Sequence, residues 1–439
     1  MMPPAATPSP EDGGGVSLSL PAAPAFVAPA AHLVEGIGAA FGMPAETARA
    51  LALASEEVIA FVAGQSAPGG RVTLSCHDRR YRMSVEISLP AAGFDPRMFN
   101  LTQAVSPEAG AEDLDHLGLL LAARMVDEFA FVRDGGRIRL LLHKLRPYPR
   151  LAPAETAPPA PDLAAAWRLA PATPERLDLL ARLAAGPAAP GFLAQPGRLA
   201  DMVAAGDLDG LVAQTADGAV LGGALWQPSG RIAELFGPWR AAGAPAGIET
   251  ALVEAGLIAL ARGPALGVIN RAPGPDFPAD WFERLGSLAT AGGTRPVLFR
   301  QLHEDPGAVS WAGPELTPFL AAHYAALGLP RRLVAPAEGG PGGPSSVLSA
   351  VTRRAEGRAV LRPALPGADC ADNIARHCRH LERSGFADLQ CELDLGQGWQ
   401  AGFVPGLLAA GFVPRFVIPH GGEGDLLVLQ RPAPAERGR

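Results

Sequence analysis

The order of hydrophobic patterns between residues 26 and 147 constrains the fold more than any other feature of the sequence. Apolar residues at three- and four-residue spacings predict helices, and apolar residues at every second position predict strands. In chain order the predictions are a helix over 28–41, a helix from 44, strands over 71–77 and 80–89, a helix over 117–126 and a hairpin over 129–143. This order predicts an α/β sandwich with helices on one face of a mostly antiparallel sheet.

The whole chain has 439 residues, which is too long for one ordinary core and predicts two or three domains. Segments rich in proline, alanine and glycine mark the predicted tails and linkers. The predicted divisions are a disordered tail (1–24), a first domain (25–147), a linker (148–162), a second domain (163–302), a connector (303–345), a third unit (346–434) and a tail (435–439). We therefore expect an α/β (α+β) protein, in which an N-terminal sandwich precedes two mixed α/β units.

Charge and cysteine content narrow the class of function. A formal net charge of -7 argues against general binding to nucleic acid or to anionic membranes. The four cysteines are sparse, which fits a reducing compartment. The sequence shows no signal-peptide pattern and no apolar run long enough to span a membrane. We therefore expect a cytoplasmic protein with no nucleic-acid and no membrane partner.

Four short segments of the first domain carry a resemblance to a known family. They are LASEEVIAFV (53–62), GFDP (93–96), LGLLL (117–121) and MVDE (125–128). Their order and spacing resemble the GHKL ATPases, in particular the anti-sigma-factor serine kinases, over roughly residues 25–147. The resemblance implies an ATP-binding fold and a protein partner that is sigma-like or anti-anti-sigma-like. It also leaves a homodimer open as an alternative.

The resemblance assigns Glu57 as the catalytic base, but the polar anchors of the family are missing. In the family, an asparagine four residues after the base ligates magnesium, and here that position is Phe61. An aromatic ring cannot ligate a cation that prefers oxygen ligands. The aspartate that reads adenine is replaced by Leu89, and the glycine two residues later is replaced by Ala91. We therefore predict no metal site, with Phe61 as a core residue and Glu57 as a solvated helix charge.

Other residues could still contact a nucleotide. The resemblance places Gly93, Gly118 and Leu119 at the nucleotide, with Gly118 as the remainder of a glycine-rich lid next to a helix N-terminus. ATP is therefore retained as a cofactor to be tested. We predict that the fold is kept while magnesium-dependent hydrolysis and phosphotransfer are lost.

The rest of the chain resembles a second family. The segments IAELFGPW (232–239), GIETALVEA (247–255), WFERLG (281–286) and LLAAGF (407–412) look like parts of a GNAT acetyltransferase core. The resemblance covers most of residues 163–434 and implies an acyl-CoA donor, with acetyl-CoA as the expected cofactor, and an amine acceptor. Two related patterns of hairpin, helix, strand, helix and strands follow one another, which suggests an internal duplication.

The loop that would hold the CoA pyrophosphate fits the family pattern in two registers, each incomplete. In the first, Gly247 is the first glycine, but Glu249 stands where the last glycine is expected and would repel a pyrophosphate. In the second, Arg240 and Gly243 fit, but Pro245 lacks the amide that is needed. Gly243 and Gly247 are therefore the candidate acyl-CoA-binding residues.

Few side chains outside these loops suggest chemistry. Glu234 is a candidate base on the central strand, and Tyr324 is a candidate acid or base in the connector. A group of cysteines and histidines lies within eleven residues, at Cys370, His377, Cys378 and His380. Its spacing matches no zinc pattern, so it predicts an ordinary helix with buried thiols rather than a metal site.

Three functions remain as alternatives. The first is a cytoplasmic bacterial regulatory protein that binds a sigma or anti-anti-sigma-like protein through residues 25–147 and a small acyl ligand through residues 163–434. The second is an active GNAT N-acetyltransferase with a regulatory N-terminal domain. The third is an ATP-dependent serine kinase, with Glu57 as the base, that acts on an anti-anti-sigma partner.

Overall fold

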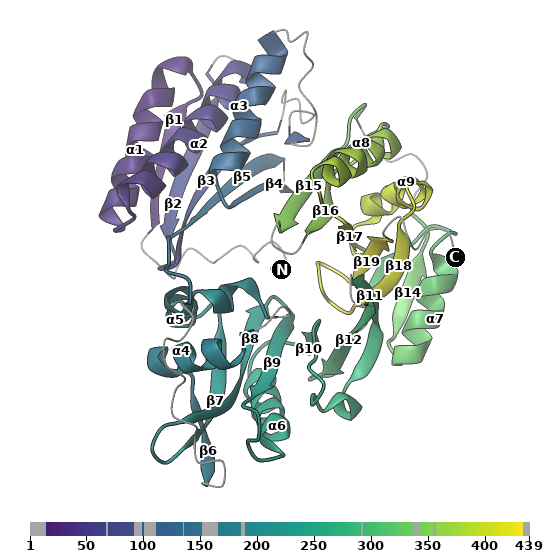
Figure 1. Ribbon diagram of the computed structural model, residues 1–439. Coiled ribbons are helices and arrows are strands. Elements are labelled where there is room, and N and C mark those ends of the chain that lie inside the picture. The colour runs from purple at the N-terminus through teal and green to yellow at the C-terminus, as the bar shows by residue number, and fades with distance from the viewer. Residues whose placement is uncertain are drawn as a thin grey trace.

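The computed structural model of the protein shows three α/β units that contact one another (Figure 1). It describes residues 15–66, 69–91, 99–100, 111–134, 136–151, 166–185, 189–290, 293–336, 343–353 and 357–432. Its main sheets have five, seven and five strands, in chain order. Within the described ranges, no helix is both long enough and apolar enough to cross a membrane.

The first unit is a five-stranded antiparallel sheet with helices packed on it, as the hydrophobic pattern predicts. Its elements are β1 (Gly15–Pro21), α1 (Val27–Ala40), α2 (Ala45–Gln65), β2 (Arg71–Asp78), β3 (Arg82–Pro90), α3 (Ala111–Met125), β4 (Glu128–Asp134) and β5 (Arg137–Leu145). The strand order is β1-β2-β3-β5-β4. Alternate residues of β2, namely Val72, Leu74 and Cys76, are buried in one apolar cluster with residues of the helices, as expected for a strand with one buried face.

Strand β1 corrects the prediction of a disordered tail over residues 1–24. Gly15–Pro21 pairs in antiparallel register with β2, from Gly15 opposite His77 to Pro21 opposite Arg71. The sequence GVSLSLP alternates apolar residues with glycine and serine, and the Ser17 and Ser75 hydroxyls lie 2.9 Å apart across the pair. The surrounding composition, rich in proline and glycine, hid this alternation. Residues 1–14 lie outside the described ranges.

The second unit is a seven-stranded sheet. Its elements are β6 (Trp167–Pro171), α4 (Pro174–Leu183), α5 (Pro196–Ala204), β7 (Asp209–Thr215), β8 (Val220–Ser229), β9 (Ile232–Arg240), α6 (Ile248–Ala261), β10 (Gly267–Asn270), β11 (Glu283–Thr290) and β12 (Gly293–Gln301). The strand order is β11-β12-β10-β9-β8-β7-β6. The central strands β9 and β10 are parallel, and the crossover between them contains α6.

Two segments of this unit differ from what their sequences predict. The pattern over 163–204 predicts helical stretches, and α4 and α5 confirm them, but the segment also contains the edge strand β6, which is too short and too close to Pro174 for alternation to stand out. The pattern over 279–285 predicts a helix, but only the turn η4 (Ala279–Trp281) is helical and β11 follows it. At Gly286, β11 passes so close to β18 of the third unit that a Cβ would lie 2.4 Å from the Arg415 carbonyl oxygen. Contact with a distant segment therefore favours strand here.

The third unit combines a small parallel pair with a five-stranded sheet. Its elements are β13 (Ala308–Trp311), α7 (Thr317–Leu327), β14 (Arg331–Val334), β15 (Val347–Arg353), β16 (Arg358–Leu365), α8 (Cys370–Arg383), β17 (Asp388–Asp394), α9 (Val404–Ala409), β18 (Val413–Ile418) and β19 (Leu426–Arg431). The larger sheet has the order β15-β16-β17-β19-β18. Leu316, Leu320 and Tyr324 of the predicted connector lie in the same apolar cluster as this sheet, so the connector packs with the third unit.

The larger sheet of the third unit repeats the topology of the second unit. In both, a hairpin leads through a helix to a parallel strand, and two further strands follow in reversed spatial order, as β8-β9-β10-β12-β11 and β15-β16-β17-β19-β18. The parallel pairs are β9 with β10 and β16 with β17. The predicted repeat of the pattern is therefore confirmed at the level of topology. The domain boundaries given above remain predictions.

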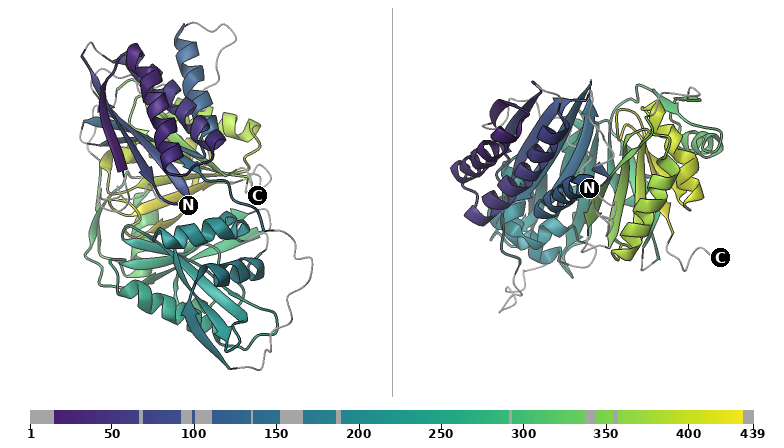
Figure 2. Two further views of the ribbon diagram at one scale, coloured as in Figure 1. Left: turned by 90° about the vertical axis from the view of Figure 1, so that its left-hand side faces the viewer. Right: turned by 90° about the horizontal axis from the view of Figure 1, so that it is seen from above.

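Each pair of units shares an apolar cluster. Val347 and Leu365 of the third unit lie in the core of the first, beside Phe131. Tyr81 of the first unit packs among buried residues of α4 and α5. Ile269 of the second unit clusters with Phe416 and other residues of β18 and β19. Seen from above, the first and third units lie side by side (Figure 2, right).

Candidate functional site

The part of the first unit that is predicted to contact a nucleotide contains an aromatic cluster. Phe61 lies one turn after Glu57 on α2 and is 3% exposed. Its ring meets that of Phe99 edge-on, with 5.7 Å between the ring centroids, and Phe99 lies 4.8 Å from Phe131. The interpretation of Phe61 as a core residue is therefore confirmed. Three aromatic rings offer no oxygen ligand to a cation.

Other positions predicted to contact a nucleotide are apolar or lie outside the described residues. Leu89, at the position of the adenine-reading aspartate, is buried in the same core. The Ala91 amide donates a hydrogen bond to the Gly136 carbonyl, so this amide is already paired with the protein backbone. Gly93 and the rest of the GFDP segment lie outside the described residues. Leu119 is fully buried in the core.

Glu57 and Gly118 are brought together between α2 and α3. A Cβ placed on Gly118 would lie 2.5 Å from Oε2 of Glu57, so a larger residue there would require the Glu57 side chain to move. The structure therefore brings together two of the residues predicted to act at a nucleotide, with the Glu57 carboxylate against the α3 backbone.

The loop that follows the first unit's β3 is attached to the third unit through Asn100. The Asn100 amide donates to the Ser346 carbonyl at 2.8 Å, and its carbonyl accepts hydrogen bonds at 3.0 Å from the Leu348 amide and from Asn373. Asn100, Ser346 and Asn373 are all buried. Asn100 of the first unit is therefore hydrogen-bonded to the third unit of the same chain.

The loop before α6 holds its own ion pair where the family binds pyrophosphate. Gly247 is the N-cap of α6 with a positive φ of 93°. Arg240 donates a hydrogen bond to the Glu249 carboxylate and another, at 2.7 Å, to the Ala244 carbonyl. Glu249 is 5% exposed, in the first turn of α6. The buried Glu249 carboxylate therefore lies next to the N-terminus of α6, where it forms an ion pair with Arg240.

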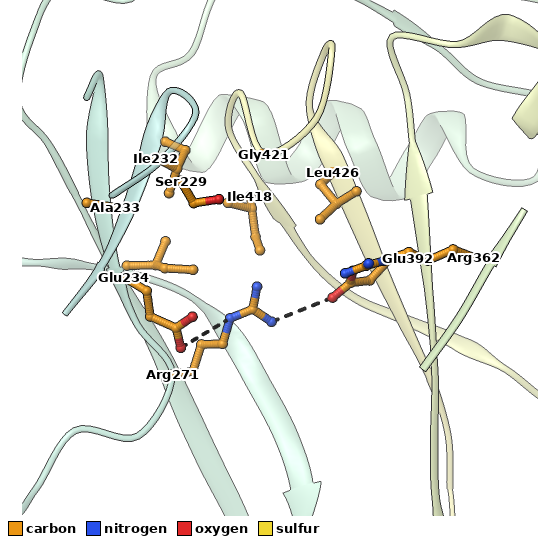
Figure 3. Close-up of a pocket in the computed structure, with 11 residues that line it drawn as sticks. Ser229, Ile232, Ala233, Glu234, Arg271, Arg362, Glu392, Ile418, Gly421 and Leu426 are labelled. Carbon is orange, nitrogen blue, oxygen red and sulfur yellow. Dashed lines mark hydrogen bonds and ion pairs between the residues drawn. The ribbon is translucent and has the colours of Figure 1, made fainter. Parts of the chain in front are cut away.

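A pocket lies between the second and third units (Figure 3). Residues from both units line it, and several come from the equivalent parallel pairs β9/β10 and β16/β17. The lining residues are Ser229, Ile232, Ala233, Glu234, Ile269, Arg271, Arg362, Glu392, Ile418, Gly421 and Leu426. Of these, Glu234 was singled out in the sequence as a candidate base.

Four charged side chains of the pocket form a chain across the boundary between the units. Arg362 donates two hydrogen bonds, of 2.9 and 2.7 Å, to Oε2 of Glu392. Arg271 lies between the carboxylates of Glu234 and Glu392, with nitrogen–oxygen distances of 3.7 and 3.8 Å (Figure 3). Burial alone would raise the pKa of Glu392, but the two guanidinium groups outweigh burial and hold that pKa below its usual value.

The β18–β19 turn, which forms one wall of the pocket, is fixed by buried charges. The Arg331 side chain is fully buried and bonds to Asp425 at 2.6 Å and to Asp305 at 2.8 Å. Asp425 also accepts a hydrogen bond from the His420 amide at 2.9 Å. Asp394 accepts hydrogen bonds from the Glu423 and Gly424 amides on the other side of the turn. Buried charges on both sides of the turn therefore bond to its backbone.

The remaining candidates of the sequence analysis have structural roles. The Tyr324 hydroxyl lies 2.9 Å from that of Ser310, and burial raises the pKa of Tyr324 far above its usual value. His377 and Cys378 are buried on α8, and Cys370 is half-buried at the start of that helix. In the part of the chain that the structure describes, no group of three or more histidine, cysteine and acidic residues could hold a metal ion.

Sequence patterns did not single out Arg271, Arg362 and Glu392. Glu392 lies within a strand that is otherwise buried, and Arg362 follows a buried stretch of β16. A charged residue in a buried strand must be paired, and this is the signal that could have identified them. Their partners could not be found in this way, because the ion pairs join segments far apart in the sequence.

Comparison with known proteins gives one family match and several weak structural resemblances. Residues 20–143 match the family model of the histidine kinase-like ATPase domain. No curated protein matches the chain. Solved structures that resemble it include GNAT acetyltransferases. One is the GNAT family N-acetyltransferase YhbS of Escherichia coli in complex with CoA, 18% identical, with 41% of this chain and 93% of that chain covered and a TM-score of 0.25.

Two further structures are of the same kind. Aminoglycoside 6'-acetyltransferase type Ii is 13% identical over 32% of this chain and 99% of that chain, with a TM-score of 0.26. A GCN5-related N-acetyltransferase from Kribbella flavida is 17% identical over 31% of this chain and 97% of that chain, with a TM-score of 0.23. At these scores the structures carry no argument about the function of this chain.

Proposed function

We propose that this protein is a bacterial cytoplasmic regulator that acts by binding rather than by catalysis. Its ATPase-like domain binds a sigma or anti-anti-sigma-like protein, and its acetyltransferase-like units bind a small ligand. Four unpaired cysteines agree with a reducing compartment. The observation that carries the proposal is the position of Phe61, whose buried ring packs on Phe99 where magnesium would be ligated.

The state of the CoA loop also supports a binding role. Glu249 already pairs with Arg240 at the N-terminus of α6, so a pyrophosphate would have to displace a carboxylate from its guanidinium partner. Phe61 therefore lies where the ATPase family would hold its metal, and Glu249 lies where the acetyltransferase family would hold the cofactor phosphate.

Magnesium-dependent turnover of ATP by the full chain is the test. We expect neither hydrolysis nor transfer of phosphate above the level of a Glu57→Gln variant, because Phe61 offers no oxygen ligand at the position of the missing asparagine. Turnover that requires magnesium and disappears in Glu57→Gln would overturn the proposal and favour the serine kinase. Binding of ATP without turnover would agree with a regulatory domain.

An active N-acetyltransferase is the second candidate, and one observation favours it. Gly247 caps α6 in a left-handed conformation, and a Cβ placed there would meet no atom within 4 Å. The space beside the helix N-terminus is therefore open on that side. Acetyl-CoA that raises the melting temperature of the full chain and is consumed with an amine acceptor would establish this function. Absence of any shift would exclude it.

A further inference from the structure

Strand β1 is an uncovered edge of the first unit's sheet. The opposite edge, β4, contacts β15 and β16 of the third unit, whereas β1 lies on the side away from that unit (Figure 2, right). In the second unit, the edge β11 contacts β18, and the edge β6 has only five residues and contains Arg168 and Pro171. Short length, charges and prolines are the usual features that keep an edge strand from pairing with another chain.

The sequence of β1 lacks these protective features. GVSLSLP has no charged residue and has proline only at its end, and its register with β2 contains no bulge. Val16 and Leu18 lie opposite Cys76 and Leu74, so they share the face of the sheet that is buried in the core. Val16 and Leu18 themselves are 42% and 41% exposed. Such an edge favours pairing with a further strand.

The backbone of β1 alternates between groups that bond to β2 and groups that point away from it. The Ala22 amide donates a hydrogen bond to the Gly70 carbonyl at 2.8 Å, immediately after the paired strands. Hydrogen-bonded pairs occur at every second residue of an antiparallel ladder. The even-numbered residues 16, 18 and 20 therefore bond to β2, and the odd-numbered residues 15, 17 and 19 direct their backbone groups outward.

These outward groups can pair with another strand. The Ser19 carbonyl accepts a hydrogen bond of 3.0 Å from the Arg71 side chain, as expected for a carbonyl that points away from β2. It can accept a second one, because a carbonyl oxygen has two lone pairs. Among the residues that the structure describes, the outward amides of Gly15, Ser17 and Ser19 have no hydrogen-bond partner.

A second copy of β1 matches this edge. In antiparallel pairing centred on Ser17, Gly15 faces Ser19 of the second copy, and Ser17 faces its own equivalent. Each of these pairs exchanges hydrogen bonds through the outward groups. Val16 then lies directly opposite Leu18 of the second copy, at a position where side chains of an antiparallel pair approach most closely. The exposed apolar residues therefore cover one another.

We propose that two copies of this chain pair through β1, so that their five-stranded sheets continue into one another across a two-fold axis at Ser17. The contact is isologous, because both copies use the same strand. The segment that precedes β1 fits the edge less well, since it has prolines at positions 3, 4, 8 and 10, which have no amide hydrogen to donate. The dimer is independent of the function proposed above and forms whether or not the first unit hydrolyses ATP.

Analytical ultracentrifugation of the full chain tests the proposal. We expect a dimer whose fraction rises with concentration. Ser17→Pro removes an outward amide but no hydrogen bond to β2, so it should weaken dimerisation at least tenfold, whereas Ser17→Ala keeps the amide and should dimerise as the parent does. Leu18→Lys places a charge in the contact and should also weaken it at least tenfold. Leu121→Lys, which changes an exposed leucine of α3, should leave it unchanged.

Cysteine cross-linking tests the register. In Ser17→Cys the introduced thiols belong to a hydrogen-bonded pair, whose Cα atoms lie about 5.5 Å apart, within the range of a disulfide. In Ser19→Cys the equivalent Cα atoms lie roughly 14 Å apart. Mild oxidation should therefore cross-link Ser17→Cys much faster than Ser19→Cys, and the parent chain controls for the native cysteines.

A chain that stays monomeric up to about 100 μM would overturn the proposal. A dimer of unchanged strength in both Ser17→Pro and Leu18→Lys would do the same, because its contact would lie elsewhere. Equal rates of cross-linking in the two cysteine variants would exclude pairing centred on Ser17. The melting temperature of each variant, measured at a concentration where the parent is monomeric, separates loss of pairing from loss of fold.

Discussion

Glu57 and Phe61 lie four residues apart, so they lie near the same face of α2. The burial of Phe61 followed from the sequence, because it shares an apolar spacing with Leu51, Ala54 and Val58. Its ring partner Phe99 could not be predicted, since Phe99 lies in a polar loop without periodicity. The sequence alone shows that the asparagine of the ATPase family is absent at position 61. The structure adds that the Phe61 ring packs on Phe99 there.

Phe61→Asn restores the polar residue of the ATPase family, yet we expect a loss of stability rather than a gain of activity. Removing a buried aromatic ring costs about 3–5 kcal/mol, and the amide would remain without a defined partner. Urea unfolding measures the loss, and Phe61→Leu, which keeps the site apolar, should lose less. Magnesium-dependent ATP hydrolysis by Phe61→Asn would contradict this expectation and show that the rest of the site is intact.

His377 predicts a pH dependence of stability. It is 1% exposed, its Nδ1 donates to the Asn373 carbonyl at 3.0 Å, and burial lowers its pKa to about 4. Between pH 6.5 and 4 the unfolded chain binds a proton at this site and the folded chain does not. The free energy of unfolding therefore falls as the pH falls, by up to about 1.4 kcal/mol per pH unit from this residue.

Urea unfolding at pH 7 and pH 4.5 compares the parent with His377→Gln, in which this contribution to the pH dependence should be absent. The exposed His32→Gln variant is the control and should follow the parent. An equal fall of stability with pH in parent and His377→Gln would show that other groups carry the acid sensitivity.

Long elements with a clear period were predicted well, and short edge elements were not. Helix α2 and strands β2 and β3 have buried residues at regular spacings, so their sequences specify both type and face. Strand β6 has five residues, and β11 is fixed by its pairing with β12 and its contact with β18. For such segments the decisive interactions come from distant parts of the chain.

The N-terminus of α6 allows a test of why CoA should not bind. In Glu249→Ala, Arg240 loses its carboxylate partner, and the first turn of α6 loses a negative charge that repels phosphate. We expect the affinity for CoA to rise at least tenfold over that of the parent, measured by calorimetric titration. Glu254→Ala, on the exposed side of the same helix, should leave the affinity unchanged. Tight binding of CoA by the parent would contradict the reasoning.

At the scale of the whole molecule, contacts between the units were beyond sequence reasoning. The residues that make them include Tyr81, Asn100 and Val347, and nothing in the sequence around them indicates which distant segment each one contacts. The structure shows that they bury apolar surface and polar groups at each boundary. The pocket between the second and third units also depends on this assembly, because both units supply its charged side chains.

Because every pair of units shares an apolar cluster, the full chain should unfold in one cooperative transition. Asn100→Ala tests this coupling where the first and third units meet. The substitution leaves the buried Leu348 amide without its acceptor, at a cost of about 1–3 kcal/mol. In scanning calorimetry we expect the transition to shift to lower temperature as a single peak, while the exposed Gln65→Ala variant should leave it unchanged. Two separate peaks in the parent protein would show that the units unfold independently despite their shared clusters.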